Sequence, residues 1–187
     1  MDRREAIAAA AVELVAEGGS HALTHRRIDR RLGVPEGTTS NYAPNRRALV
    51  RMVIDRVAAI ADLRGGDRPP PATVSEAVPQ LVAAFETTVA RGTDTRARMA
   101  LSIDTLQDPE LHELLTTASP VRAKLLDEAS GMLTSLGVPD PDARAVDFIG
   151  IMNGLLYDRL VGNGVRGTRV DAANLLRAWL VGVGARQ

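Results

Sequence analysis

The residues best suited to chemistry lie in a short N-terminal segment between Thr24 and Arg51. This segment holds seven arginines but only two acidic residues, Asp29 and Glu36. Residues 36–42 add hydroxyl and amide groups that can bond base edges, and threonine methyls that can contact thymine. Arginine supplies the positive charge that binds phosphate. The combination indicates contact with nucleic acid, and the alternative is an ordinary solvated helix face.

Two predicted short helices must position these groups. Thr24 is a good N-cap for the first helix, in which Ile28 and Leu32 lie one turn apart and face inward. Gly33 permits a tight turn after it, and a second helix is expected from about Glu36 to Tyr42. This second helix is too polar to be present for stability alone. The pattern is typical of a helix-turn-helix, whose second helix enters the DNA major groove.

Helical periodicity continues through most of the chain, and strand patterns are nearly absent. The fold is therefore predicted to be all-α, with about ten helices. An N-terminal helix-turn-helix domain is expected over residues 1–64, a Gly- and Pro-rich linker over 65–73, and a second helical domain over 74–187. Helices in the second domain are expected at about 74–91, 94–107, 109–117, 120–136, 141–162 and 171–184. Their predicted starts follow good N-caps at Thr73, Asp108, Ser119 and Asp140, and Pro79 is expected to kink or delay the first of them.

The charge is distributed unevenly over the 187 residues. With 23 basic and 23 acidic side chains, the formal net charge is zero, which taken alone argues against DNA. Residues 1–64, however, carry eleven arginines and eight acidic residues, a net charge of +3, whereas residues 65–187 carry −3. A basic head followed by an acidic body favours approach to DNA by the head.

Catalytic and metal-binding patterns are weak. The chain has no cysteine, which excludes disulfides, thiolate metal sites and thiol nucleophiles. His21 and His25 flank a helix start, and the acidic residues around His112 are explained by the N-cap and the helix dipole. We therefore expect no catalytic residue, no bound metal, no cofactor and no enzymatic activity. Without a signal peptide or a membrane span, the sequence predicts a cytoplasmic protein.

A set of residues between positions 4 and 50 recurs in a known order and spacing: Ala10, Leu14, Glu17, Gly18, Gly19, Leu23, Thr24, Ile28, Leu32, Gly33, Val34, Pro35, Gly37, Thr38, Pro44, Arg46, Arg47, Ala48 and Leu49. With this set, residues 4–50 resemble the DNA-binding region of the tetracycline-repressor (TetR) family. The family usually has an aromatic residue at position 40, Phe at 43 and Lys at 46, where this chain has Ser40, Ala43 and Arg46.

The resemblance implies a role for each matching polar residue. It implies that Thr24 binds a phosphate, that Thr38, Thr39 and Asn41 read base edges, and that Tyr42 and Arg46 bind phosphates at the groove rim. Arg26 and Arg27 are further candidates for phosphate contacts. Arg30, Arg31 and Arg47 are instead expected to pair with Asp29, Glu36 and neighbouring acidic residues.

The last two predicted helices have apolar residues on more sides than one core requires. They either form a fully buried centre or pair with their copies in a second subunit, and Gly150 and Gly154 would allow close helix approach. The resemblance implies the second arrangement, a homodimer with one DNA half-site for each subunit. The predicted interface residues are Phe148, Ile151, Leu155, Leu176, Trp179 and Val183.

The resemblance also implies that residues 74–187 form an effector-binding and dimerisation domain, with a small-molecule effector bound among the middle helices. For any single Met or aromatic residue, ordinary core packing is the favoured interpretation. The candidate liners are Phe85, Met99, Ile103, Gln107, Met132, Met152, Asn153 and Tyr157.

Together these features predict a homodimeric transcriptional regulator, a repressor released from a palindromic DNA operator by its effector. The alternative is an all-α interaction module whose basic helices bind an acidic protein partner. Salt-sensitive, sequence-selective binding to duplex DNA would distinguish the two.

Overall fold

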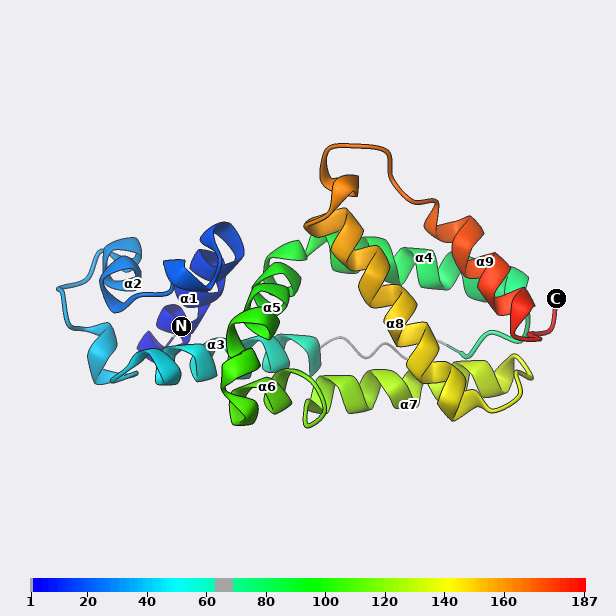
Figure 1. The fold of residues 1–187 in the computed structure, drawn as a ribbon, viewed down its shortest axis with the longest axis horizontal. Helices are drawn as coiled ribbons and strands as arrows, with labels where there is room; N and C mark the ends of the chain where they lie inside the picture. Colours follow the sequence, from blue (N-terminus) through cyan, green and yellow to red (C-terminus); the bar gives the residue numbers. More distant parts are fainter. Residues whose placement is uncertain (1, 63–68) are drawn as a thin grey trace. The chain divides into compact units, whose positions relative to one another are not determined.

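The computed structural model describes residues 2–62 and 69–187, and every regular element in these ranges is helical (Figure 1). The predicted all-α fold is confirmed. The chain divides into two compact units: Met1–Gly65 with Gly92–Val121, and Gly66–Arg91 with Arg122–Gln187. Within the described ranges, no helix is long and apolar enough to cross a membrane.

The first unit surrounds the alanine-rich helix α1, against which α2, α3 and α5 pack. Ile7 and Ala11 of α1, Val53 of α3, and Ala97 and Leu101 of α5 are fully buried in one core. Its elements are α1 (Arg3–Gly18), η1 (Ser20–Ala22), α2 (His25–Leu32), η2 (Thr39–Asn41), α3 (Arg46–Asp62), α5 (Gly92–Asp104), η3 (Thr105–Gln107) and α6 (Pro109–Leu115), where η denotes a 3-10 helix.

This packing divides the chain differently from the predicted domain boundaries. Helices α5 and α6 share the core of the N-terminal helices, whereas the sequence pattern assigned them to the C-terminal domain. The alanines of α1 allow close approach of α5, a contact that local periodicity does not reveal. Part of the predicted linker, residues 65–68, lies outside the described residues.

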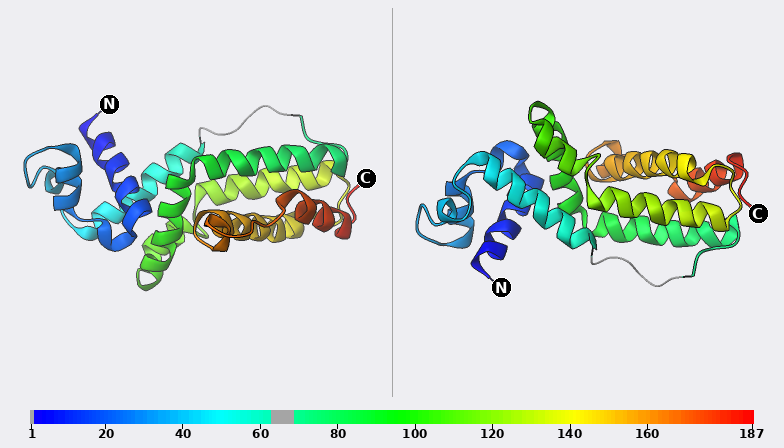
Figure 2. Two further views of the ribbon diagram at one scale, coloured as in Figure 1. Left: turned by 90° about the horizontal axis from the view of Figure 1, so that it is seen from above. Right: turned by 90° about the horizontal axis from the view of Figure 1, so that it is seen from below.

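The second unit contains α4 (Val74–Ala90), most of α7 (Pro120–Ser135), α8 (Pro141–Leu160), η4 (Asn163–Val165) and α9 (Ala172–Gly182). Helix α4 packs against both α8 and α9, and Figure 2 gives two further views of these helices. The C-terminal segment joins the other helix ends, because Arg186 O accepts from Val74 N at 2.8 Å and Arg186 N donates to Leu136 O at 2.9 Å.

Most of the expected helix starts are confirmed. The side chains of Thr24, Thr73 and Asp108 accept hydrogen bonds from the first turns of α2, α4 and α6. Asp140 is an exception, since its backbone is left-handed (φ 52°) and its side chain makes no capping bond. Pro79 lies within α4, which begins at Val74, so this proline does not delay the helix start.

Candidate DNA-binding surface

The segment after α2 is less helical than its sequence suggests. Residues 36–38 form a turn and Thr39–Asn41 a single 3-10 turn, where an α-helix was expected from Glu36 to Tyr42. Gly33 ends α2 in the left-handed conformation (φ 64°), as the sequence predicts, and Gly37 has φ 91°. Because a left-handed residue cannot continue an α-helix, Gly37 limits the length of the second helix. We call residues 36–42 the polar turn.

Asp29 of α2 connects this turn to the rest of the unit. Its carboxylate is 1% exposed. Oδ1 accepts hydrogen bonds from the Thr39 N–H at 2.9 Å and the Thr39 hydroxyl at 2.5 Å, and Oδ2 accepts from the Gly37 N–H at 2.8 Å. Burial alone would raise the pKa of Asp29, but these hydrogen bonds and the nearby His25 outweigh it and hold the pKa below its usual value. The carboxylate is therefore charged and buried beneath the turn.

Helix α2 is itself firmly attached to its neighbours. Arg31 binds Glu17 and Glu13 of α1, with nitrogen–oxygen distances of 2.5 and 3.1 Å. His25 Nε2 lies 2.6 Å from the carbonyl oxygen of Ala43, which joins the start of α2 to the end of the turn. Ala43 is fully buried, so the small residue at this position fills a core site.

Thr39 does not have the base-reading role suggested by the family resemblance. Its side chain is 0% exposed and its hydroxyl bonds Asp29, so it faces the protein and has no access to a groove. Sequence reasoning assigned it with the other polar residues because local sequence does not show which face of a short turn is inward. Asp29 was missed for the same reason, since it was expected to form a surface ion pair.

The other polar side chains of the turn point outward. Asn41 and Tyr42 are exposed and Thr38 is half-buried. The Thr38 hydroxyl donates to Pro35 O at 2.7 Å, so its lone pairs and methyl group remain for other contacts. Ser40 is also exposed between Thr39 and Asn41, and the sequence interpretation had not included it among the site residues.

The arginines differ sharply in how they are used. Arg46 was expected to bind phosphate, but its guanidinium donates to Leu23 O (3.2 Å), Ser20 O (3.1 Å) and Asp104 Oδ2 (3.0 Å). These bonds use three of the five guanidinium N–H groups and join the start of α3 to η1 and α5. Because the guanidinium faces these protein acceptors, Arg46 is not included among the proposed phosphate contacts.

The remaining arginines divide into paired and unpaired groups. Arg47 pairs with Asp108 and Glu110, not with the acidic residues expected. Arg26 forms an exposed ion pair with Glu36 at 3.0 Å, and Arg51 pairs with Asp55. Of the seven arginines between Thr24 and Arg51, all within the described part of the chain, only Arg27 and Arg30 make no ion pair or side-chain hydrogen bond; both are exposed on α2.

Thr24 lies at the N-terminus of α2, as expected. Its Oγ accepts a hydrogen bond from the Arg27 N–H at 3.3 Å and its side chain is exposed. Free N–H groups and the helix dipole favour an anion at this position. Thr24 and the exposed Arg27 thus lie together at the start of α2, where an anion is favoured.

A second surface feature lies on α8. Its buried face includes Phe148, Leu155 and Leu156, but another row of small and apolar residues is exposed. These residues are three or four positions apart and so share one side of the helix. We call this row the apolar stripe: Val146, Gly150, Gly154 and Tyr157 on α8, and Val161, which directly follows the helix.

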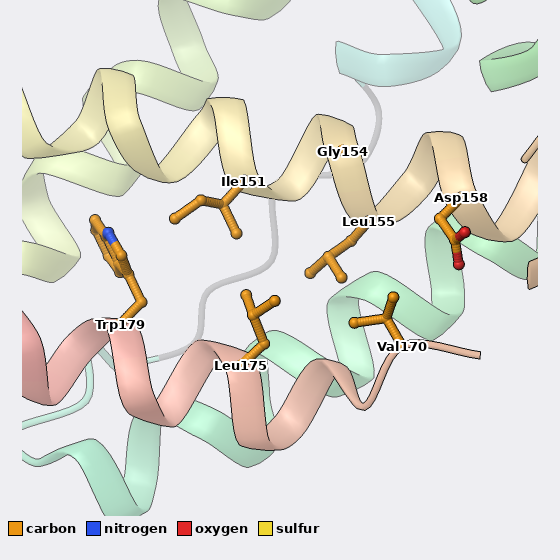
Figure 3. A pocket seen from close by; sticks show the side chains of 7 residues that line it. All are labelled: Ile151, Gly154, Leu155, Asp158, Val170, Leu175 and Trp179. Atoms are coloured by element: carbon orange, nitrogen blue, oxygen red, sulfur yellow. The ribbon is translucent and has the colours of Figure 1, made fainter. Parts of the chain in front are cut away.

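Beside the stripe, an apolar groove of about 470 Å³ lies between α8 and α9 (Figure 3). Side chains of Ile151 and Leu155 on α8 point toward Leu175 and Trp179 on α9. The groove is also lined by Gly154, Asp158 and Val170.

The predicted interface residues divide into two groups. Leu176 is 0% exposed, and Phe148 and Leu155 are also buried within the subunit, so these three stabilise the monomer fold. Phe148 packs against Trp179 with ring centroids 5.7 Å apart. Ile151, Trp179 and Val183 are half-buried and keep part of their surface exposed.

The predicted ligand residues do not converge on one site. None of the eight lines the α8–α9 groove or the second pocket, of about 640 Å³, around Leu160–Gly167. Ile103 is 71% and Tyr157 53% exposed, which contradicts an enclosed position, and Gln107 is also exposed. Phe85 is buried beneath the Arg159 guanidinium, 5.4 Å from the ring centroid. The half-buried residues are Met99, Met132, Met152 and Asn153.

Comparison with known proteins identifies the class. The family model described as "Tetracyclin repressor-like, C-terminal domain" matches residues 69–182, and "Bacterial regulatory proteins, tetR family" matches residues 7–53. The chain therefore belongs to the TetR family of transcriptional regulators, which are DNA-binding proteins and not enzymes.

Two solved structures share the whole fold. A transcriptional regulator from Rhodococcus sp. RHA1 has a TM-score of 0.74 and 19% identity, with 100% of this chain and 99% of that chain covered. A TetR-like transcriptional regulator from the same organism has a TM-score of 0.63 and 20% identity, covering 98% and 99%. A search of curated proteins gives no significant match.

Proposed function

We propose that this chain is a cytoplasmic homodimeric repressor that binds a near-palindromic DNA operator and releases it when a small-molecule effector binds. The observation that carries the proposal is the polar turn. It exposes hydrogen-bonding side chains at Thr38, Ser40 and Asn41 beside two arginines, Arg27 and Arg30, that have no acidic partner. Exposed polar groups next to uncompensated positive charge suit base edges flanked by phosphates.

In this proposal Asn41 and Thr38 read base edges, with Ser40 added to them. The methyl group of Thr38 suits a thymine methyl, and its hydroxyl oxygen accepts a hydrogen bond because its proton is directed to Pro35. Phosphates are bound by Thr24 and Tyr42 and by Arg27 and Arg30. Arg26 joins them because its exposed ion pair with Glu36 is weak enough for DNA to replace it.

The second subunit is proposed to bind along the apolar stripe of α8 and the adjoining surface of α9. The stripe is exposed, and a Cβ built on Gly150 or Gly154 would meet no atom within 4 Å, so another helix can approach closely there. Leu175 and Trp179 extend the apolar surface onto α9. Tyr157, expected from sequence to line a ligand pocket, is proposed as an interface residue instead.

The dimer is tested by sedimentation velocity of the wild type and of Tyr157→Arg. Since arginine on the stripe would be desolvated without a partner, the variant is expected to sediment as a monomer. Val165→Arg, an exposed position outside the stripe, is the control and should remain dimeric. A dimeric Tyr157→Arg variant would exclude this interface.

The effector is proposed to bind the predicted C-terminal domain, residues 74–187. Met132, Met152 and Asn153 are the strongest remaining candidates, because their side chains are half-buried on α7 and α8. Effector and DNA would favour different dimer geometries, so that the binding of one weakens the binding of the other.

DNA recognition is tested by selecting bound sequences from a random duplex pool with the full chain. The proposal expects enrichment of one motif with two-fold symmetry, in which each half-site is read by one polar turn. Enrichment of no sequence, or salt-sensitive binding without preference, would contradict it and favour an interaction with an acidic protein partner.

A further inference from the structure

The polar turn has little regular structure of its own. Only Thr39–Asn41 form a 3-10 turn, and so short an element makes few internal hydrogen bonds. Base reading nevertheless requires side chains held within about 0.5 Å of the productive geometry. The turn must therefore be fixed from outside.

The buried carboxylate of Asp29 provides this attachment. It accepts from the Gly37 N–H at 2.8 Å, the Thr39 N–H at 2.9 Å and the Thr39 hydroxyl at 2.5 Å. With Gly37 and Thr39 held toward α2, the intervening Thr38 and the following Ser40 and Asn41 face outward.

We infer that Asp29 is the positioning residue of the DNA-reading surface, and that its hydrogen bonds to Gly37 and Thr39 set sequence selectivity. The inference rests on the function proposed above. Asp29 touches no DNA in this arrangement, since it is 1% exposed, and acts through the residues it holds. The buried Asp29 carboxylate keeps its hydrogen-bond donors only while the turn stays in place. Leaving this carboxylate buried without donors would cost free energy.

Helix α2, which carries Asp29, is itself fixed to the rest of the unit. Asp29 follows Ile28, which is 0% exposed in the core, and Arg31 on the same helix binds Glu13 and Glu17 of α1. The polar turn is thus attached to the core of the first unit through α2. Arg27 and Arg30 belong to α2 itself and do not depend on Asp29 for their position. Loss of the Asp29 bonds should therefore reduce selectivity more than it reduces non-selective affinity.

The test compares Asp29→Asn with the wild type and with Arg31→Gln as the matched control. Asn keeps the size of the side chain but cannot accept at both oxygens, so at least one buried N–H loses its partner. Arg31→Gln perturbs the same helix by weakening its ion pairs with α1 and leaves the polar turn attached. Affinities for the selected operator and a scrambled duplex are measured by fluorescence anisotropy, and thermal unfolding reports the folded fraction.

The ratio of operator affinity to scrambled-duplex affinity is expected to fall about tenfold or more in Asp29→Asn. Scrambled-duplex affinity should change less than twofold, and the ratio should stay at the wild-type value in Arg31→Gln. An unchanged ratio in folded Asp29→Asn would overturn the inference, as would an equal loss in the control. A merely stabilising residue would lower the folded fraction without altering this ratio.

A second variant covers the case in which Asp29→Asn does not fold. Thr39→Val keeps the shape and the main-chain bond of Thr39 but removes its hydroxyl donor. In Thr39→Val, the ratio of operator affinity to scrambled-duplex affinity should fall about three- to tenfold. An unchanged ratio would overturn the inference.

Amide hydrogen exchange separates this inference from the proposed function, because it needs no DNA. The Gly37 and Thr39 amides should be protected in the wild type and exchange at least about tenfold faster in Asp29→Asn. Lack of selectivity in the wild type, with these amides protected, would refute the proposed function. Selectivity in the wild type with unprotected amides would refute the positioning role alone.

Discussion

The polar turn and the α8–α9 surface expose opposite kinds of side chain and are fixed in opposite ways. In the turn, polar groups face outward above a buried carboxylate, and hydrogen bonds from Gly37 and Thr39 hold the segment. On α8, the exposed row is apolar, and the helix is fixed by burying its other side, which includes Phe148 and Leu155. Hydrogen bonds fix a short segment at a few atoms, whereas packing fixes a long helix along its length.

This difference predicts how each region responds to substitution. Small chemical changes beneath the turn should alter which DNA is bound. On α8 and α9, the effect should depend on which side of the helix is changed, because one side faces the core and the other is open.

The largest effect is expected from Leu176→Ala on α9. Leu176 is 0% exposed, so its truncation leaves a cavity and should lower the free energy of unfolding by about 2–5 kcal/mol. The neighbouring Arg177 is exposed and is not part of the proposed dimer surface, and Arg177→Ala should change the free energy of unfolding by about 0.5 kcal/mol or less. Urea unfolding at one fixed protein concentration measures both. Similar losses in the two variants would show that the side of α9 assigned to the core is wrong.

The next effect concerns pH and the buried carboxylate of Asp29. Its pKa in the folded state lies below the usual value, so the charged form stabilises the fold above about pH 4, and this contribution is lost as pH falls through the folded-state pKa. At pH 7, the free energy of unfolding of Asp29→Asn should be about 1.5–3 kcal/mol lower than that of the wild type.

The difference in the free energy of unfolding between the two proteins should narrow as pH falls from about 4 through the lowered folded-state pKa of Asp29, since below that pKa both proteins carry an uncharged side chain at position 29. Because other carboxylates are shared by both proteins, the difference isolates Asp29. A gap that is constant down to pH 2 would contradict the assigned charge state.

A smaller effect is expected from the N-cap of α2. Thr24→Ala removes the acceptor for the Arg27 N–H and should lower the free energy of unfolding by about 1 kcal/mol. Because the same hydroxyl is proposed to bind phosphate, DNA affinity should also fall, equally for all sequences. Thr24→Ser keeps the hydroxyl and should restore both properties, and its failure to do so would exclude the proposed role.

The smallest effect distinguishes unpaired from paired arginines. Arg27→Ala should reduce the slope of log affinity against log salt by about 1, because one phosphate contact and its released counterion are lost. Arg51, which pairs with Asp55 on α3, is the control, and Arg51→Ala should leave the slope unchanged. Equal slopes in all three proteins would exclude Arg27 as a phosphate contact.

The sequence predicts where the helices of this protein begin better than it predicts which of their side chains are buried and which are exposed. The starts of α2, α4 and α6 follow from side-chain caps, which act within one turn and can be read locally. The inward position of Thr39 and the use of Arg46 between α3 and α5 depend on partners 10 and 58 residues away. Local sequence carries no information on contacts at that separation.

The same limit applies in the second unit. The excess of apolar residues on α8 and α9 is evident from the sequence and correctly indicates more than one apolar side. Which side is open depends on how α4 packs against both helices, so Leu176 and Phe148 were assigned to the wrong surface. Gly150 and Gly154, expected from the sequence to allow close helix approach, have no atom within 4 Å of an added Cβ, and the approach of a second helix there stays a prediction.

The central claim, that the exposed side chains of the polar turn read DNA bases, is tested most directly by repeating the duplex selection with Asn41→Ala. Wild type and variant are selected in parallel from one random pool. The account expects the variant to lose preference at one base pair of each half-site, corresponding to about 1–3 kcal/mol, and to keep the rest of the motif. An identical enriched motif from both proteins would contradict it.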